Sequence, residues 1–381
     1  MASTATRRPP RLLTIALGLG LALLIAGCAG PNEPEGRPSA PTTEPRPAST
    51  APNEGRTLKP VGAGLYIFDT GQPQPRFQAQ AIDHAVIGGA WADFEPRAGV
   101  FKGPGWHRVA AALRDQPDFK FRLRILAGRD APDWVKRLDG GCVQIEEPAN
   151  QIPACVPRFW TKAYLEAYKG LMVEVARRYD SEPRILDVVN SACTTTWAEP
   201  FIRTGWNRSA NLALWQAGLN EESDRRCFER SMQVMDQAFR ATRISLATHL
   251  VWQIVVGPSS GSGMRPSWPK ERALLNQLRS RYGAKLVVQN NGLGGNEGCH
   301  PGEPLQSASS MWCWLASAPP PKGFQSEGPI NLKGSGSTVV DTVRRAIDMG
   351  GCFVEHNKFG DNPAEAAKLD RQLKANCPGS S

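Results

Sequence analysis

The sequence of 381 residues lacks the signatures of several enzyme classes. It has no H-E-x-x-H and no P-loop pattern, so zinc-protease and P-loop nucleotidase interpretations lose their main support. It has no C-x-x-C, and Cys299-His300 is the only cysteine next to a histidine, which disfavours a structural metal site. The run Gly292-Leu293-Gly294-Gly295 does not open a convincing helix, so it is not a dinucleotide fingerprint. We therefore expect no metal and no cofactor.

A dense basic cluster is also missing. Lys and Arg exceed Asp and Glu by nine, but Arg7, Arg8 and Arg11 precede the first apolar run, and without them the surplus is six. The rest is spread along the chain, which disfavours nucleic-acid binding. Tyrosine is scarce, with five residues against eleven tryptophans, and no tryptophan occurs before Trp91.

The N-terminus has the features of an export signal. Behind the three arginines, residues 12–26 form an apolar run too short for a comfortable membrane span. The run ends in Ile25-Ala26-Gly27-Cys28, which resembles the lipobox of bacterial lipoproteins. That resemblance implies a signal peptide over 1–27, a lipid on Cys28 and attachment to the outer face of the cytoplasmic membrane or cell envelope. A plain secretory signal is the alternative.

The segment 28–60 is rich in proline and poor in large apolar side chains. Such a segment cannot bury enough surface to offset its ordering entropy, so we expect a disordered tether. The folded part is then a single domain over 61–379, which we expect to be monomeric.

The number of cysteines supports export. Nine cysteines are present, and eight remain if Cys28 carries lipid. An even number in an exported protein predicts disulfides, for which eight cysteines allow 105 pairings. Pairing of neighbours is our expectation, because Cys142 with Cys155 and Cys299 with Cys313 would each close a short loop.

The domain alternates short apolar runs with amphipathic segments. We expect strands at 64–68, 85–91, 119–126, 185–189, 244–256, 285–289, 323–325 and 352–354. We expect helices at 106–113, 164–179, 228–239, 268–282, 304–315, 339–347 behind a possible Ser337 cap, and 363–375. Repeated β-then-α units imply parallel strands, and eight units favour an α/β fold of the closed (β/α)₈ TIM-barrel type. An open doubly wound sheet is the alternative.

Two motifs point to a family. The pattern Trp91-x-x-x-Glu95-Pro96-x-x-Gly99-x-Phe101 resembles the strand-two signature of TIM-barrel glycoside hydrolases of the clan with catalytic glutamates on strands four and seven. The loop Pro132-Asp133-Trp134 after the third strand is similar to the loop that follows the same strand in that clan. The resemblance implies a retaining glycosidase with a poly- or oligosaccharide substrate.

The resemblance maps two catalytic residues. Strand four at 185–189 leads into Trp197-Ala198-Glu199-Pro200, so Glu199 takes the acid/base role. Glu327 follows strand seven and takes the nucleophile role, with roughly 5–5.5 Å expected between the carboxyl groups. Such a pair is needed because one carboxyl protonates the leaving oxygen while the other stabilises the oxocarbenium ion. Glu355 at the end of strand eight is the rival nucleophile. In the alternative without catalysis, Glu199 forms an ion pair with Arg203. Glu327 then pairs with Lys322 or Lys333.

Further residues near strand ends are candidates for substrate binding. Ala198 stands where the clan has Asn, so Asn190 is a candidate for binding the sugar 2-hydroxyl. For Glu95, the alternative to substrate binding is an ion pair with Arg124. For the aromatic and amide candidates, the alternative is packing or turn formation. The remaining candidates are Trp91, Asp93, Glu95, Asp133, Trp134, Trp197, His249, Trp252, Asn290, Asn291 and Glu355.

The leading hypothesis is thus a surface glycoside hydrolase. A lipoprotein that binds glycan on the same barrel without cleaving it is the second hypothesis, because the fold hosts many functions.

Overall fold

The computed structural model describes residues 57–68, 82–146, 153–198, 208–248, 267–299, 308–328, 332–334, 336–356, 362–377 and 379. The expected signal peptide, Cys28 and the tether up to residue 56 lie outside this part. Glu199, His249 and Trp252 lie outside it as well.

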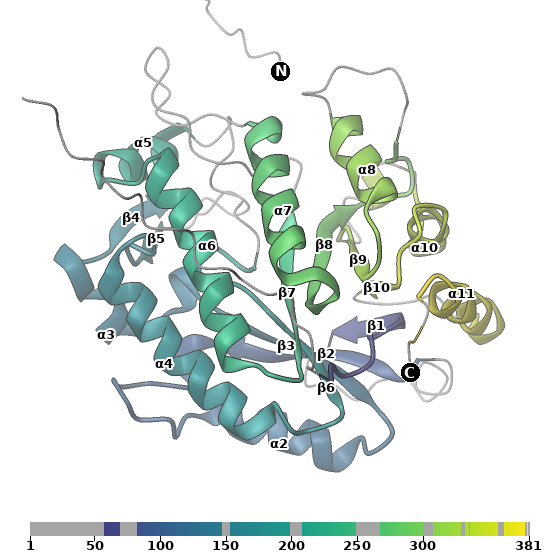
Figure 1. Ribbon diagram of the computed structural model, residues 1–381, viewed down its shortest axis with the longest axis horizontal. Coiled ribbons are helices and arrows are strands. Elements are labelled where there is room, and N and C mark those ends of the chain that lie inside the picture. Colours follow the sequence, from purple (N-terminus) through teal and green to yellow (C-terminus); the bar gives the residue numbers. More distant parts are fainter. Residues whose placement is uncertain are drawn as a thin grey trace, which may run out of the picture. The chain divides into compact units, whose positions relative to one another are not determined.

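Eight parallel strands close into a barrel, which confirms the TIM-barrel prediction and excludes the open sheet (Figure 1). Around the barrel they follow chain order: β1 Gly64–Phe68, β2 His84–Ala90, β3 Lys120–Leu126, β6 Ile185–Val189, β7 Arg243–Thr248, β8 Leu286–Leu293, β9 Lys322–Ser326 and β10 Phe353–His356. The circle closes where β10 pairs with β1, Leu65 opposite Val354. β6 is therefore the fourth barrel strand and β9 the seventh, as predicted.

Helices surround the barrel, and each predicted helix has a counterpart. They are α2 Pro104–Asp115, α3 Asp133–Lys136, α4 Lys162–Tyr179, α5 Arg208–Gln216, α6 Glu221–Ala238, α7 Trp268–Tyr282, α8 Ala308–Ser317, α10 Val339–Asp348 and α11 Pro363–Ala375. The cap of α10 is Thr338 rather than Ser337. The Thr338 hydroxyl accepts the Asp341 N–H while the Asp341 carboxylate accepts the Thr338 N–H, so two otherwise unpaired backbone donors are satisfied.

An antiparallel hairpin, β4 Val143–Glu146 with β5 Pro153–Val156, was not predicted. Its residues alternate between buried and exposed, as in a strand with one face on the protein.

The core has two parts. A large apolar cluster fills the space between the strands and the helices, and it includes Leu65, Ile67, Leu123 and Val188. A smaller cluster lies inside the barrel and includes Tyr66, Val86, Val287 and Phe353. Successive residues of a strand point to opposite faces, so β1 supplies Leu65 and Ile67 to one cluster and Tyr66 to the other.

The folded domain begins before the predicted boundary at residue 61. Lys59 is buried, and its Nζ donates to the carbonyl oxygens of Tyr179, Glu182 and Ile185 and to the Thr242 hydroxyl at 2.7–3.0 Å. Burial lowers the Lys59 pKa to about 8. The last residues assigned to the tether therefore belong to the barrel.

Four disulfides join neighbouring cysteines, as predicted: Cys142–Cys155, Cys193–Cys227, Cys299–Cys313 and Cys352–Cys377. Such a set is typical of exported proteins. Among the helices of the described part, none has the length and apolar character needed to cross a membrane.

Candidate active site

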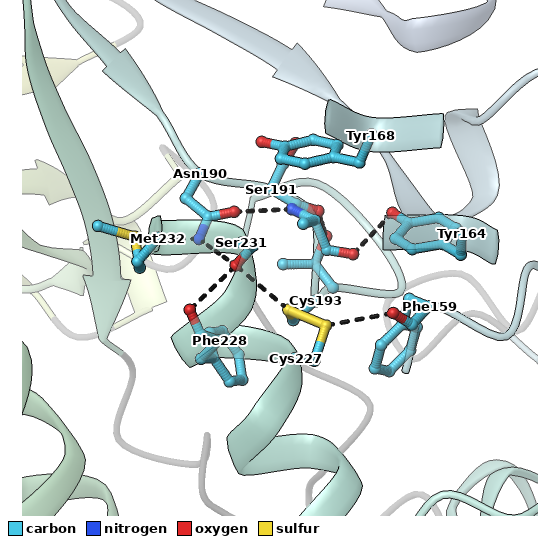
Figure 2. The surroundings of a disulfide bond; sticks show 12 residues. Phe159, Tyr164, Tyr168, Asn190, Ser191, Cys193, Cys227, Phe228, Ser231 and Met232 are labelled. Atoms are coloured by element: carbon cyan, nitrogen blue, oxygen red, sulfur yellow. Dashed lines mark hydrogen bonds between the residues drawn. A yellow bond between two sulfur atoms is a disulfide. The ribbon is translucent and has the colours of Figure 1, made fainter. Parts of the chain in front are cut away.

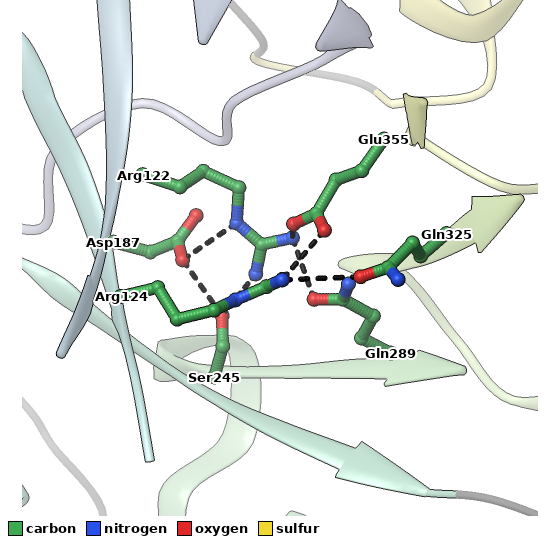
Figure 3. A network of polar contacts seen from close by, with 7 residues as sticks. All are labelled: Arg122, Arg124, Asp187, Ser245, Gln289, Gln325 and Glu355. Carbon is green, nitrogen blue, oxygen red and sulfur yellow. Dashed lines mark hydrogen bonds and ion pairs between the residues drawn. The ribbon is translucent and has the colours of Figure 1, made fainter. Parts of the chain in front are cut away.

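A network of polar side chains from the barrel strands lies in the interior of the barrel (Figure 3). Arg122 is fully buried, and its guanidinium binds Asp187 at 2.9 Å, Gln289 at 2.6 Å, Ser245 at 2.6 Å and Glu355 at 2.6 Å. These residues come from five different strands. Side chains alternate between the two faces of a strand, and in each of these strands the residue lies on the face that points into the barrel. Burial by itself lowers the Arg122 pKa, but Asp187 and Glu355 outweigh burial and raise it.

Arg124 is two residues further along β3 and lies nearer to the barrel mouth than Arg122. Its guanidinium binds Glu355 Oε2 at 2.5 Å and Gln325 Oε1 at 3.1 Å. The side chain is 10% exposed, whereas those of Arg122 and Glu355 are fully buried. Two arginines thus pair with two carboxylates, and the network forms a polar layer beneath the mouth.

This arrangement bears on the alternative role of Glu95, an ion pair with Arg124. Arg124 is held by Glu355 and Gln325 instead. Glu355, the rival nucleophile and a candidate for substrate binding, gives one oxygen to each arginine.

The strand-two signature forms a buried corner. Glu95 accepts the Trp91 indole N–H at 3.0 Å and the Gly99 backbone N–H at 2.9 Å, while its carbonyl accepts the Trp134 indole N–H at 3.1 Å. Gly99 has φ +70°, a conformation that glycine adopts without strain. Burial raises the Glu95 pKa. The motif thus orders the loop after β2, and Trp91, which is fully buried against Tyr164, is part of the core.

The neighbouring candidates lie closer to solvent. Asp93 pairs with Arg108 at 2.5 Å, and Asp133 is exposed as the first residue of α3. Trp134 is half-buried, with its ring edge-on to Trp91 at 6.2 Å between centroids. Substrate contact by these three residues stays a prediction.

The segment after β6 is packed up to the edge of the described part (Figure 2). The Asn190 amide donates to Ser231 Oγ at 2.8 Å, and its oxygen accepts the Ala192 N–H at 2.9 Å. The Asn190 side chain is therefore engaged with α6 and its own loop. The Ala192 carbonyl accepts the Tyr164 hydroxyl at 2.7 Å.

The same segment contacts the loop after β3. A Cβ atom on Gly128 would lie 2.4 Å from the Thr195 carbonyl oxygen, and Arg129 N–H donates to that oxygen at 2.9 Å. Only glycine permits this approach. Trp197 has φ +54°, a left-handed conformation that is uncommon for a bulky residue. Strained backbone of this kind gathers at functional sites, and it lies two residues before Glu199.

Asn290 and Asn291 are consecutive residues in the second half of β8. The Asn290 amide donates to the Thr248 carbonyl at 3.2 Å, and its oxygen accepts the Gly292 N–H at 2.9 Å. Asn291 is buried too, and it lies where the pairing of β8 with β9 is irregular, between Asn290 and Leu293. Substrate contact by these two residues stays a prediction.

Two carboxyl groups lie side by side where β8 and β9 end. Glu327 is half-buried directly after β9, and its N–H donates to the Leu293 carbonyl at 3.0 Å. A Cβ atom on Gly294 would lie 3.4 Å from Glu327 Oε2 and 3.8 Å from Glu297 Oε2. The carboxyl groups of Glu327 and Glu297 therefore both lie next to Gly294 at the barrel mouth.

Their electrostatics are unusual. Burial raises the Glu327 pKa, and burial together with the neighbouring Glu327 charge raises the Glu297 pKa, although the Gly294 N–H at 2.8 Å opposes this. Neither Lys322 nor Lys333 pairs with Glu327 within the described part; the Lys322 ammonium instead binds the carbonyls of Leu315 and Ala316. Perturbed carboxyls in a barrel mouth mark a candidate active site.

Sequence reasoning missed Glu297. Its position shortly after the sixth strand was the available signal.

A further pattern, Gly257-Pro258-Ser259-Ser260-Gly261, fits G-x-S-x-G but lies outside the described residues. That motif needs the strand-to-helix turn of an α/β-hydrolase sheet, and the closed barrel is a different fold.

The fold and the mouth carboxyls thus define a TIM barrel with a polar interior. No protein-family model matches the chain, and no curated protein matches it. Among solved structures, it is similar to endo-glycoceramidase II from Rhodococcus sp., with 14% identity and a TM-score of 0.45 over 85% of this chain and 81% of that one. The β-galactosidase from Marinomonas ef1 has 11% identity and a TM-score of 0.45 over 82% and 59% of the two chains. A likeness this distant carries no argument about function.

Proposed function

We propose that the protein is a retaining glycoside hydrolase acting on a cell-surface or extracellular glycan, with Glu199 as acid/base and Glu327 as nucleophile. The observation that carries the proposal is the Glu327 carboxyl, which follows the seventh strand at the barrel mouth without a cationic partner in the described part. The strained Trp197 after the fourth strand supports the assignment of Glu199.

The chemistry follows from the two roles. Glu199 donates a proton to the glycosidic oxygen while ionised Glu327 attacks the anomeric carbon; water then releases the sugar, with Glu199 acting as base. The environment that raises the Glu327 pKa disfavours its ionised form at low pH. We therefore expect kcat/KM to fall on acidification through a pKa above the ordinary glutamate value of 4.5.

The second candidate is a glycan-binding surface lipoprotein without turnover. Ala198 supports it, because it stands where the resembled clan has Asn and cannot make the usual hydrogen bond to the sugar 2-hydroxyl. Hydrolysis of aryl glycosides by the full chain separates the two functions.

Variants of the full chain test the assignment. Glu327→Ala should lower kcat at least about 10³-fold, and azide should restore turnover and yield a glycosyl azide of inverted configuration, because azide replaces the missing nucleophile. Glu199→Gln should retain activity on substrates whose leaving group needs no protonation. Glu222→Gln, an exposed acid on α6, is the control.

Two outcomes contradict the proposal. Full activity of Glu327→Ala would remove the nucleophile from this position. Binding of oligosaccharides without hydrolysis of any substrate by the wild type would favour the binding protein.

A further inference from the structure

A surface groove lies between α4 and α6, away from the barrel lumen. The two helices pack side by side on the outside of the barrel (Figure 1). The groove has a volume of about 530 Å³, and its apolar part is formed by Trp160, Leu165 and Val234. It is lined by the first half of α4, up to Lys169, and by the part of α6 from Arg226 to Gln237.

The charged side chains along the groove are mostly basic. Lys162 and Lys169 come from α4, and Arg226 and Arg230 come from α6, whereas Glu166 is the one acid in the lining. Lys169 and Arg226 each have an exposed carboxylate partner one helical turn away, a type of pair that contributes little. Within the described part, Lys162 and Arg230 have no carboxylate partner. An anionic ligand would therefore gain two cations without displacing an existing ion pair.

The uncharged lining suits sugar rings. Trp160 is half-buried, with its ring edge-on to Phe159 at 5.1 Å, and it forms the aromatic wall. An indole face packs on the apolar face of a pyranose while leaving the sugar hydroxyls free. Gln233 and Gln237 line the same groove, and their amides can bind hydroxyls. The Gln233 oxygen also accepts the Arg230 guanidinium at 3.3 Å, a neutral contact that an anion on Arg230 can replace.

We propose that this groove, lined by α4 and α6, binds an acidic polysaccharide. A sugar ring stacks on Trp160, and the carboxylate or phosphate groups of the chain pair with Lys162 and Arg230. A flat anionic bilayer fits the concave, aromatic-walled groove less well, and it is the competing occupant. This binding does not depend on hydrolysis at the barrel mouth.

Binding by the full chain to three probes tests the proposal: hexagalacturonate, a phosphomannan oligosaccharide and neutral cellohexaose. We expect at least one acidic probe to bind more tightly than cellohexaose, with affinity that falls as salt rises. The double variant Lys162→Gln/Arg230→Gln should weaken that binding about tenfold or more. Trp160→Ala should weaken it as well, since stacking is lost.

The matched control is Lys368→Gln/Arg371→Gln, which removes the same charge from the exposed face of α11. Equal losses in the control and groove variants would overturn the proposal, because they would indicate a non-specific effect of net charge. Binding of phosphatidylglycerol vesicles, but of neither acidic probe, with loss in the groove variant would assign the groove to the membrane. Unchanged cleavage of a small aryl glycoside by the groove variant would show that the two sites are separate.

Discussion

Glu271 shows how one residue can make stability depend on pH. It lies in the first turn of α7 with its side chain fully buried, where Thr248 Oγ1 donates to Oε1 and Oε2 has no partner within the described part. Burial raises its pKa well above the ordinary glutamate value of 4.5, although the Thr248 hydrogen bond opposes this. The native state therefore holds a proton here that the unfolded chain releases.

The sign of the pH effect follows. Above about pH 4.5 the unfolded state binds fewer protons at this position than the native state, so the free energy of unfolding falls as pH rises towards the native pKa. Glu271→Gln removes this dependence. We expect its melting temperature relative to wild type to increase between pH 4.5 and pH 8, measured by calorimetry. Glu222→Gln, an exposed first-turn acid on α6, should show no such trend, and a parallel shift in both variants would contradict the prediction.

Between elements, the Cys193–Cys227 disulfide connects the loop after β6 to α6 (Figure 2). Its two cysteines are 34 residues apart, compared with 13 for Cys142–Cys155, which bridges the β4–β5 hairpin. The longer loop loses more entropy in the unfolded state when it is closed. This bridge also anchors the backbone that leads to Glu199.

We expect Cys193→Ala/Cys227→Ala to lower the free energy of unfolding by about 3–4 kcal/mol in urea denaturation. If Glu199 is catalytic, kcat should fall as well, because the segment that carries it loses an anchor. Cys142→Ala/Cys155→Ala is the control and should lower stability less, with kcat nearly unchanged. Equal effects of the two pairs on kcat would argue against a positioning role for the first.

For the whole molecule, the disulfides and the N-terminal pattern together favour a domain outside the cytoplasm. The four bridges use every cysteine except Cys28. The remaining cysteine is the one that the lipobox resemblance assigns to the lipid. A groove for acidic glycan beside the barrel would suit a protein held at the cell envelope.

The corresponding prediction concerns anchoring. Cys28→Ser should move the protein from the membrane fraction to the soluble fraction, because a thioether-linked lipid can no longer form. The denatured, unreduced mature protein should show close to no free thiol, measured with a thiol reagent. Retention of the Cys28→Ser variant in washed membranes would contradict lipidation at this position.

Local patterns were enough to predict the order of the barrel strands. Apart from Asp187, Ile185–Val189 consists of Ile, Leu and Val, residues that favour a buried strand. Trp268–Tyr282 has the same bounds in the prediction and in the structure. Neighbouring cysteines paired as expected because each bridge closes a loop of 13 to 34 residues, within reach of local chain folding.

Only the tertiary structure decided which polar groups meet. Arg122 and Glu355 are 233 residues apart in the chain, and closure of the barrel brings them to 2.6 Å. Glu297 became a candidate only when β8 and β9 paired and set it beside Glu327. Hydrophobic periodicity reports which face of an element is buried, and it carries no record of the partner across the barrel. The sequence by itself therefore determined the elements and their order, while the charge partners at the mouth followed from the closed geometry.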